Sequence, residues 1–122
     1  MNILLVNVPS RKGRGGFMIP LGLLQVGSIV EQFGHIAKIV DPYLLDKYAI
    51  EGLNMNLYDV IIEEFKPDII GFGGIATSYG KVKEFSLHIK QRYPKIIQIA
   101  GGPLASVYDL LLTHTKVDIV IH

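Results

Sequence analysis

Two glycine-rich segments are the most distinctive candidates for ligand binding in this sequence. One is Gly71-Phe72-Gly73-Gly74-Ile75-Ala76-Thr77, and the other is Gly101-Gly102-Pro103. Glycine has no Cβ atom, so a ligand can approach the backbone of such segments closely. The first segment fits the dinucleotide pattern GxGxxA superficially, but no acidic residue that could hold a ribose ends the next apolar run, at Ala100. The pattern therefore argues against a nicotinamide site and leaves other close-approach ligands open.

A basic segment after the first apolar run is a second candidate. It contains Arg11, Lys12 and Arg14 among glycines, but no GxxxxGK[ST] sequence, which excludes a P-loop. Three cations could neutralise one phosphate group by charge pairing. A solvated loop that orders only with a partner explains the same residues equally well. A phosphate- or nucleotide-binding domain thus stays open as an alternative.

Side chains for catalysis or metal binding are sparse. The chain has no Cys, which excludes a disulfide, a thiolate nucleophile and an iron–sulfur cluster within it. Its four histidines are not spaced to share a metal ion. Ser10, Thr77, Ser78 and Ser106 have no histidine placed to activate them, so we interpret them as hydrogen-bond donors, with Ser78 also suited to cap a helix. We expect no catalytic residue and no metal ligand in this chain.

The elements that must position these segments can be read from the apolar pattern. Continuous aliphatic runs predict five strands, at residues 3–6, 37–40, 69–72, 96–100 and 119–121, each buried on both faces. Helical spacing lies between them, at residues 20–34, 57–65, 82–93 and 104–114. Strand alternating with helix predicts an α/β fold with a doubly wound parallel sheet, of the flavodoxin-like kind with strand order 2-1-3-4-5.

The helix pattern supplies further expectations. In the first helix an apolar stripe comprises Leu23, Val26, Val30 and Phe33, and Gly34 is suited to end it. In the last helix we expect residues 110–112 to be buried, and we expect Asp41 with the following proline to form a turn. Ligands of such sheets bind beyond the carboxyl ends of the strands, where the loops at residues 7–19, 73–80 and 101–105 should meet.

Length and charge limit the class of protein. The chain has 122 residues, 49% hydrophobic and 19% charged, which fits one domain over residues 1–122. A formal net charge of +1 provides no broad field for nucleic acid or an anionic membrane. No apolar run is long enough to span a bilayer, so we expect a cytoplasmic protein. The sequence stops at its fifth predicted strand, and we expect it to be the N-terminal fragment of a longer chain.

Four short motifs in this order resemble the N-terminal cobalamin (B12)-binding domain of B12-dependent radical S-adenosylmethionine enzymes. They are Ile3-Leu4-Leu5-Val6-Asn7-Val8-Pro9-Ser10, Pro20-Leu21-Gly22-Leu23-Leu24, Lys66-Pro67-Asp68-Ile69-Ile70-Gly71 and Gly101-Gly102-Pro103. The resemblance covers essentially the whole chain. It implies cobalamin as the cofactor and a binding site made of Val8, Pro9, Ser10, Gly73, Gly74, Ile75, Thr77, Gly101, Gly102 and Pro103.

The chain departs from the wider cobalamin-binding pattern at three places. Residues 7–12 replace the DxHxxG loop, so the histidine that would ligate cobalt is missing. Gly73 stands where the serine of SxL is found, with Thr77 nearby, and Leu104 stands where many relatives have the histidine of GGPH. An apolar surface for the corrin ring could come from Val8, Pro9, Phe17, Met18 and Ile19.

The resemblance also implies a partner. Relatives continue into a radical S-adenosylmethionine domain whose CxxxCxxC motif binds an iron–sulfur cluster, and this chain has no such motif. The implied partner is that C-terminal domain of the same chain, and the reaction is methyl transfer or related radical chemistry. No activity is expected from these residues alone. A degenerate structural module that docks on the catalytic domain without cofactor remains the main alternative.

Overall fold

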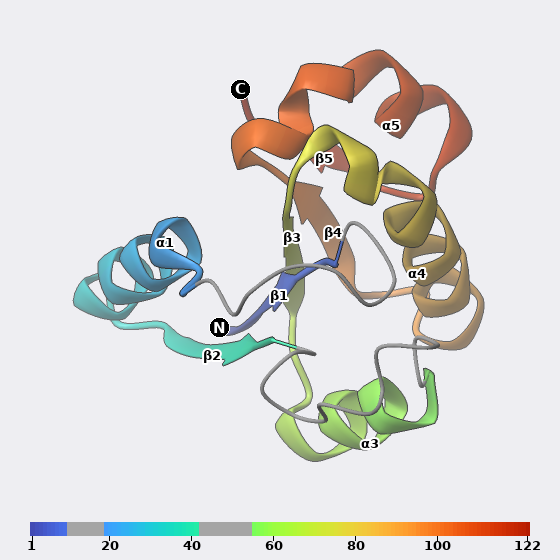
Figure 1. Cartoon of the computed structure of the whole chain (residues 1–122). Coiled ribbons are helices and arrows are strands. Elements are labelled where there is room, and N and C mark those ends of the chain that lie inside the picture. Colours follow the sequence, from blue (N-terminus) through green and yellow to red (C-terminus); the bar gives the residue numbers. More distant parts are fainter. Residues whose placement is uncertain (10–18, 42–54) are drawn as a thin grey trace.

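The chain folds around one parallel sheet. The computed structural model describes residues 1–9, 19–41 and 55–122, and in this part five parallel strands have the order β2-β1-β3-β4-β5 (Figure 1). The predicted flavodoxin-like α/β fold and its strand order are confirmed. The elements are β1 (Asn2–Asn7), α1 (Leu21–Gln32), β2 (Ile36–Val40), α3 (Met55–Phe65), β3 (Ile69–Gly73), the 3₁₀ helix η2 (Ala76–Ser78), α4 (Tyr79–Arg92), β4 (Ile97–Ala100), the 3₁₀ helix η3 (Gly102–Val107), α5 (Tyr108–His114) and β5 (Ile119–Val120).

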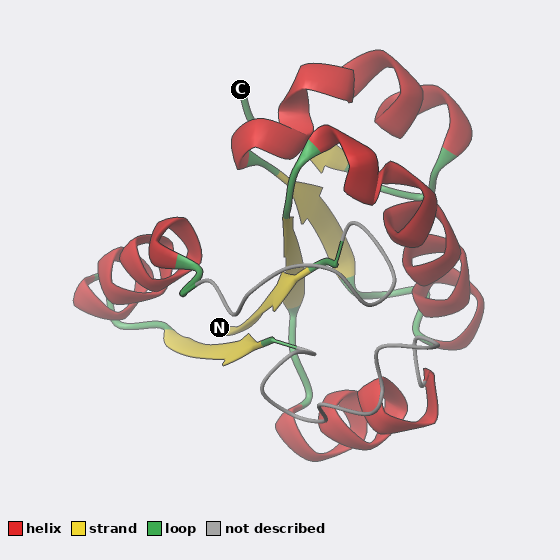
Figure 2. Ribbon diagram, in the orientation of Figure 1, coloured by secondary structure: helices red, strands yellow, loops and turns green. Residues whose placement is uncertain are grey.

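The two faces of this sheet are covered unequally. Helices α3, α4 and α5 lie on one side of it, and α1 lies on the other (Figure 2). Alternate strand residues Leu4, Ile70 and Phe72 are fully or nearly fully buried in the three-helix core, where Phe72 meets Phe85 of α4. Because side chains alternate along a strand, the residues between them face the side of α1. On that second face α1 is the one helix of the described residues that packs against the sheet.

Burial along the strands follows from this asymmetry. Strand β1 is buried on both faces, as predicted, because α1 packs against it and β2. In β3 and β4 burial alternates residue by residue. On the face of α1, Ile97 is 45% exposed and Ile119 is 46% exposed. The expectation that every strand is buried on both faces is therefore wrong beyond β1.

Helix α1 contacts the sheet through a small residue. A Cβ atom at Gly27 would lie 3.4 Å from Cδ1 of Ile39. The predicted apolar stripe is only partly buried, because Val26 is 45% exposed and Phe33, just beyond the last helical residue, is 77% exposed. Gly34 has a φ of +85° and its N–H donates to the Glu31 carbonyl at 3.0 Å, so the predicted glycine termination is confirmed.

Helix α5 buries one residue of its apolar run. Leu111 is fully buried, whereas Leu110 is 42% exposed and Leu112 is 51% exposed. Successive residues on a helix point in different directions, so three in a row cannot all face the core. The expected burial of residues 110–112 is wrong for two of the three. None of the helices in the described ranges combines the length and apolar character needed to cross a membrane.

One of the motifs behind the family resemblance has a structural role at the amino edge of the sheet. The side-chain amide of Asn2 donates to the Phe65 carbonyl at 2.9 Å, and the Asn2 N–H donates to Asp68 Oδ2 at 2.8 Å. Lys66, the residue after α3, has a φ of 52°, and its N–H donates to the Ile62 carbonyl at 2.8 Å. The segment Lys66-Pro67-Asp68 thus joins α3 to the start of β1.

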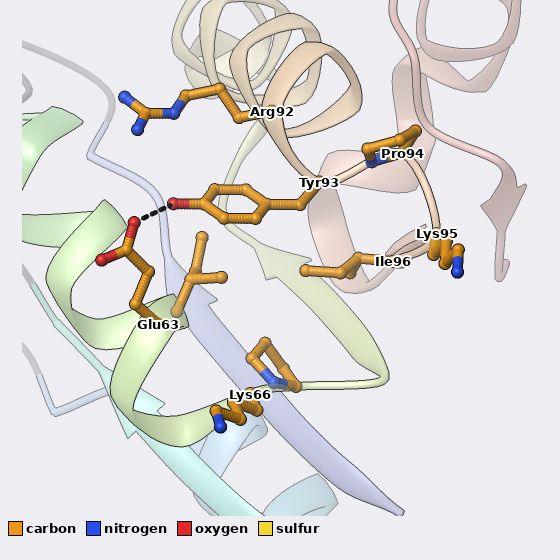
Figure 3. A pocket seen from close by; sticks show the side chains of 9 residues that line it. Glu63, Lys66, Arg92, Tyr93, Pro94, Lys95 and Ile96 are labelled. Carbon is orange, nitrogen blue, oxygen red and sulfur yellow. Dashed lines mark hydrogen bonds between the residues drawn. The ribbon is translucent and has the colours of Figure 1, made fainter.

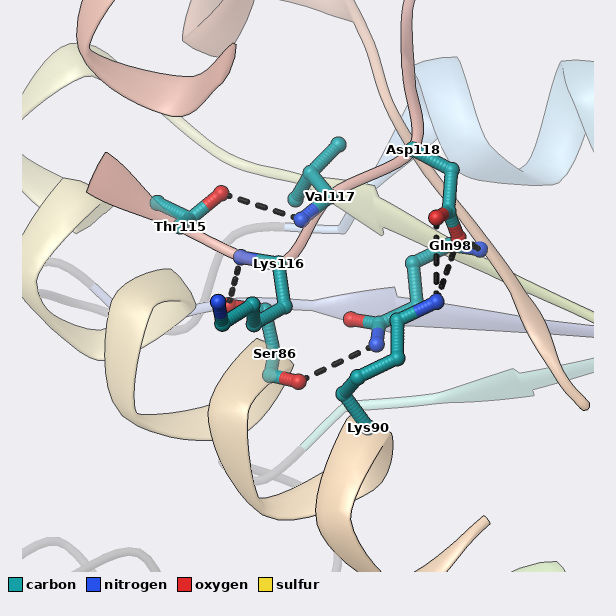
Figure 4. A network of polar contacts seen from close by, with 7 residues as sticks. All are labelled: Ser86, Lys90, Gln98, Thr115, Lys116, Val117 and Asp118. Carbon is teal, nitrogen blue, oxygen red and sulfur yellow. Dashed lines mark hydrogen bonds and ion pairs between the residues drawn. The ribbon is translucent and has the colours of Figure 1, made fainter. Parts of the chain in front are cut away.

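A polar network positions β5 beside β4 (Figure 4). The Lys116 N–H donates to Ser86 Oγ at 3.0 Å, and the Gln98 N–H donates to Asp118 Oδ2 at 2.8 Å. Lys90 Nζ lies 3.0 Å from Asp118 Oδ1. Partial burial alone would raise the pKa of Asp118, but the Gln98 N–H and the Lys90 ammonium outweigh it and lower the pKa. These contacts attach the segment before β5 to α4.

Candidate functional site

A pocket of about 540 Å³ opens between α1 and the carboxyl edge of the sheet. Two rows of residues across the strands form its floor. Strand register places Leu5, Gly71 and Ile99 in one row and pairs Asn7 with Gly73 in the next. Gly101 and Ile121 lie beyond Gly73, since their N–H groups donate to Phe72 and Ala100 at 3.2 and 2.9 Å. The other lining residues are Pro20, Gly22, Leu23, Gln25 and Val26 on the side of α1, and Phe72, Gly74, Ile75, Gly102 and Pro103 at the carboxyl edge.

Three glycines of this floor differ in what lies above them. A Cβ atom at Gly71 would stand 2.8 Å from Cδ2 of Leu5, and one at Gly73 would stand 2.8 Å from Cδ2 of Leu23. At Gly101 the nearest atoms would be the Ile121 carbonyl oxygen at 3.6 Å and its Cβ at 3.9 Å. The space over the first two is therefore occupied by leucine side chains of this protein. Of these three positions, only Gly101 is free of a close contact above it.

Gly74 serves the packing of two loops against each other. A Cβ atom there would lie 2.8 Å from Ser78 Oγ and 3.2 Å from the Val8 carbonyl oxygen. Ser78 Oγ donates to that same carbonyl at 3.0 Å, and the Val8 N–H donates to the Gly73 carbonyl at 2.8 Å. Ser78 does precede α4, but its hydroxyl makes no cap bond to the helix, contrary to the expected capping role. It joins the loop after β3 to the chain after β1 instead.

The residues expected to bind cofactor separate into three groups. Those that line the pocket are Gly73, Gly74, Ile75, Gly101, Gly102 and Pro103. Val8 is buried behind the floor, and neither the half-buried Pro9 nor the exposed Thr77 is among the lining residues. Of the expected corrin surface, Ile19 is 58% exposed. The positions that lie outside the described residues are Ser10, Arg11, Lys12, Arg14, Phe17 and Met18.

A buried carboxylate behind the pocket was missed by the sequence interpretation. Asp41, expected in a turn, is only 3% exposed, and its Oδ2 accepts from Asn7 Nδ2 at 3.0 Å. Burial, with the nearby charge of Asp41, raises the pKa of the Tyr58 hydroxyl, which has no hydrogen-bond partner among the described residues. The pairing follows from the strand register, because Asn7 ends β1 and Asp41 follows β2, its neighbour in the sheet.

The described lining of the pocket is neutral. Its only polar side chains are the amides of Asn7 and Gln25, and the remaining lining residues are apolar or glycine. Within residues 1–9, 19–41 and 55–122, no group of acidic residues or histidines is arranged to hold a metal ion. This arrangement suits an uncharged, largely apolar group.

A second pocket, of about 480 Å³, lies at the amino edge of the sheet (Figure 3). Lys66, Arg92 and Lys95 line it together with Tyr93, whose hydroxyl donates toward Glu63 at 3.3 Å. Its cations stand at or just beyond the last residues of α3 and α4, where positive charge compensates the helix dipole. We therefore interpret this pocket as structural.

Beside that pocket, Asp59 of α3 is held by residues of α4 and the residue that follows it. The side chain of Asp59 contacts His88 Nε2 at 2.8 Å, Arg92 Nη1 at 3.0 Å and the Tyr93 hydroxyl at 3.0 Å. Burial alone would raise the pKa of Asp59, but the hydrogen bonds from His88 and Tyr93 and the charges of His88 and Arg92 lower it overall. This group joins two helices of the core and was not predicted.

Comparison with known proteins gives one distant similarity. The chain is 24% identical over 107 residues to the anaerobic magnesium-protoporphyrin IX monomethyl ester cyclase of Synechocystis sp., a match that covers 84% of this chain and 20% of the cyclase. The chain thus corresponds to about a fifth of the length of that relative. No protein-family model matches the chain, and no solved structure matches it.

Proposed function

We propose that this chain is a cobalamin-binding module whose pocket takes the nucleotide tail of the cofactor. The observation that supports this most is the pocket floor at Gly101, between the carboxyl ends of the strands and α1, where a Cβ atom would meet only ordinary van der Waals contacts. A volume of about 540 Å³ lies within the range of about 300–1,000 Å³ typical of small-molecule sites. It admits a nucleoside-sized group, while a corrin ring stays outside, above the carboxyl edge.

Two further lines support the proposal. The ordered motifs resemble the cobalamin domain of radical S-adenosylmethionine enzymes, and each of the four, at residues 3–10, 20–24, 66–71 and 101–103, contributes pocket-lining residues. The cyclase to which the chain is similar is, by its name, an anaerobic enzyme that acts on a porphyrin ester. Ring closure without oxygen is the kind of reaction that radical cofactors support.

The residues of this chain would then bind and orient the cofactor without ligating its metal. Pro9 stands where the DxHxxG pattern has its histidine, so retention depends on the tail and the edge of the corrin. When bound, the cofactor supplies methyl transfer or related chemistry, and the domain controls its position and its access to water. The radical step, with its iron–sulfur cluster and S-adenosylmethionine, would belong to a separate catalytic domain of the same protein.

A second candidate is a structural module that docks on such a domain without cofactor. The exposed isoleucines on the face of α1, Ile97 and Ile119, favour it, because parallel sheets are normally covered on both faces. Leu23 filling the space over Gly73 also favours it. This candidate is distinguished from the first by a complete failure to retain cobalamin.

The test is retention of hydroxocobalamin. The purified chain is mixed with hydroxocobalamin, with cobinamide, which lacks the nucleotide tail, or with AMP, and then passed through gel filtration. We expect the visible spectrum of hydroxocobalamin to travel with the protein and cobinamide to be lost. Colourless protein would contradict the proposal, and retained AMP would instead support a nucleotide-binding domain.

A further inference from the structure

We propose that Asn7 selects the group that enters the pocket, by presenting its Oδ1 atom as a hydrogen-bond acceptor. The buried part of the ligand then bears an N–H or O–H donor and no negative charge. This inference rests on the proposed function of the pocket and adds the chemistry of the group it takes.

The orientation of the Asn7 amide is set by its neighbour. An ionised carboxylate can only accept hydrogen bonds, so the amide must turn its NH₂ group toward Asp41. The observed contact, Nδ2 to Oδ2 at 3.0 Å, has this arrangement. A flipped amide would place two acceptor oxygens against each other at a buried position, since Asp41 is only 3% exposed. The carboxylate therefore fixes which end of the amide is left for the ligand.

Asn7 stands on a part of the pocket floor with few side chains. Asn7 lies on the same face as Leu5, and its partner across the sheet is Gly73. Asn7 Oδ1 accepts no hydrogen bond from the part of the chain that the structure describes, although Asn7 lines the pocket. Covering this oxygen with an apolar group would remove its water without replacing the hydrogen bond. A ligand with a donor avoids that cost.

Charge adds a second criterion. No cationic side chain is among the described residues of the pocket lining, and the Asp41 carboxylate is hydrogen-bonded to Asn7. Both features disfavour an anion at the floor. In a nucleotide tail, the sugar hydroxyls are neutral donors that meet these criteria. The phosphate would remain at the mouth of the pocket, away from Asp41.

The experiment compares two asparagine variants in binding titrations with hydroxocobalamin. Asn7→Leu removes the acceptor, and we expect Kd to rise about tenfold, the usual effect of leaving one hydrogen bond unmade. Asn56→Leu makes the same change at an exposed position of α3 that does not line the pocket, and we expect its Kd to stay within about twofold of wild type. Asp41→Asn frees the amide to turn, and we expect an intermediate loss.

The outcomes separate this inference from the proposed function. If the wild-type protein fails to bind hydroxocobalamin, the proposed function fails. If the wild-type protein binds and Asn7→Leu binds equally well, only the role of Asn7 is overturned. Should Asn7→Leu unfold, the side-chain NH₂ signals of Asn7 in wild-type ¹H–¹⁵N spectra decide the question. We expect them to shift on adding hydroxocobalamin, and unmoved signals in a saturated complex would overturn the inference.

Discussion

Leu23 of α1 lies over Gly73 of β3, so that a Cβ atom at residue 73 would stand 2.8 Å from Leu23 Cδ2 and 3.0 Å from its Cγ. This contact is one of the few by which α1 meets the sheet, since Gly27 is the only residue of that helix that is buried. The absence of a side chain at residue 73 therefore serves the packing of this protein. It also sets the position of one wall of the pocket.

Gly73→Ala should lower the free energy of unfolding by about 1–3 kcal/mol, because the added methyl group overpacks the contact with Leu23. In a Leu23→Ala background the same substitution should be nearly neutral. Urea denaturation of the two single variants and the double variant measures this coupling. Strictly additive losses would show that the two residues do not interact.

The contacts of Asp59 predict a loss of stability in acid. Its pKa is lowered in the folded protein below the ordinary value of 3.8, so the unfolded chain binds a proton more readily. The contribution of Asp59 to the free energy of unfolding is therefore complete above about pH 5. It is lost as the pH falls through the pKa of Asp59 in the folded protein. Asp118, with a pKa lowered in the same direction, adds to the effect.

Asp59→Asn should lower the free energy of unfolding by about 2 kcal/mol near neutral pH. The reason is that His88, Arg92 and Tyr93 then no longer have a charged hydrogen-bond partner. The variant should also show a weaker decline in stability between pH 5 and pH 3. Denaturation curves across that range, compared with those of the exposed control Glu84→Gln, test both parts. A decline in Asp59→Asn as steep as that of wild type would refute the linkage.

Gln98 is fully buried in β4, and only one of the two polar atoms of its side chain has a hydrogen-bond partner among the described residues. Its Nε2 donates to the Ser86 carbonyl at 3.0 Å, while Oε1 has no hydrogen-bond partner among the described residues. Gln98→Met keeps the length of the side chain and removes the unpaired acceptor, so we expect unchanged stability or a gain of up to about 1 kcal/mol. Thermal unfolding measures this, and a loss of 2 kcal/mol or more would show that the hydrogen bond from Nε2 to the Ser86 carbonyl outweighs the unpaired acceptor.

The uncovered face should make the isolated chain associate with itself. Ile97 and Ile119 expose nearly half of their side chains there, beside the still more exposed Ile121. We expect Ile97→Glu and Ile119→Glu to shift sedimentation coefficients at high protein concentration toward the monomer without lowering the unfolding temperature of the monomer. Identical sedimentation of wild type and variants would exclude this face as the contact.

The features predicted from sequence were those encoded locally. The five aliphatic runs, separated by helical spacing and by residues such as Gly34, were sufficient for the fold class and the strand order. The pairing of Asn7 with Asp41 depends on strand register between residues 34 positions apart, which no local pattern contains. The same is true of Asp59, whose partners lie 29 to 34 residues later in the chain, beyond β3 in the sequence.

The glycines show the same limit more sharply. Gly73 and Gly101 look equivalent in sequence, each ending a strand of apolar residues. In the fold, one lies under Leu23, some fifty residues earlier in the chain, and the other lies beside Ile121, where a Cβ atom would meet only ordinary contacts. The exposure of the sheet face next to α1 could not be predicted from sequence either. An uninterrupted aliphatic run predicts a buried strand but does not say which helices bury it.

The most direct test of the central claim is an equilibrium titration of three proteins with hydroxocobalamin. Gly101 has extended backbone, with a φ of −159°, and a Cβ atom there meets only ordinary contacts, so Gly101→Leu should fold and place its side chain in the pocket. Gly80→Leu adds the same side chain at an open position on α4, away from the lining residues. We expect saturable binding by wild type and Gly80→Leu and none by folded Gly101→Leu. Equal binding by all three, or by none, would contradict a cofactor tail in this pocket.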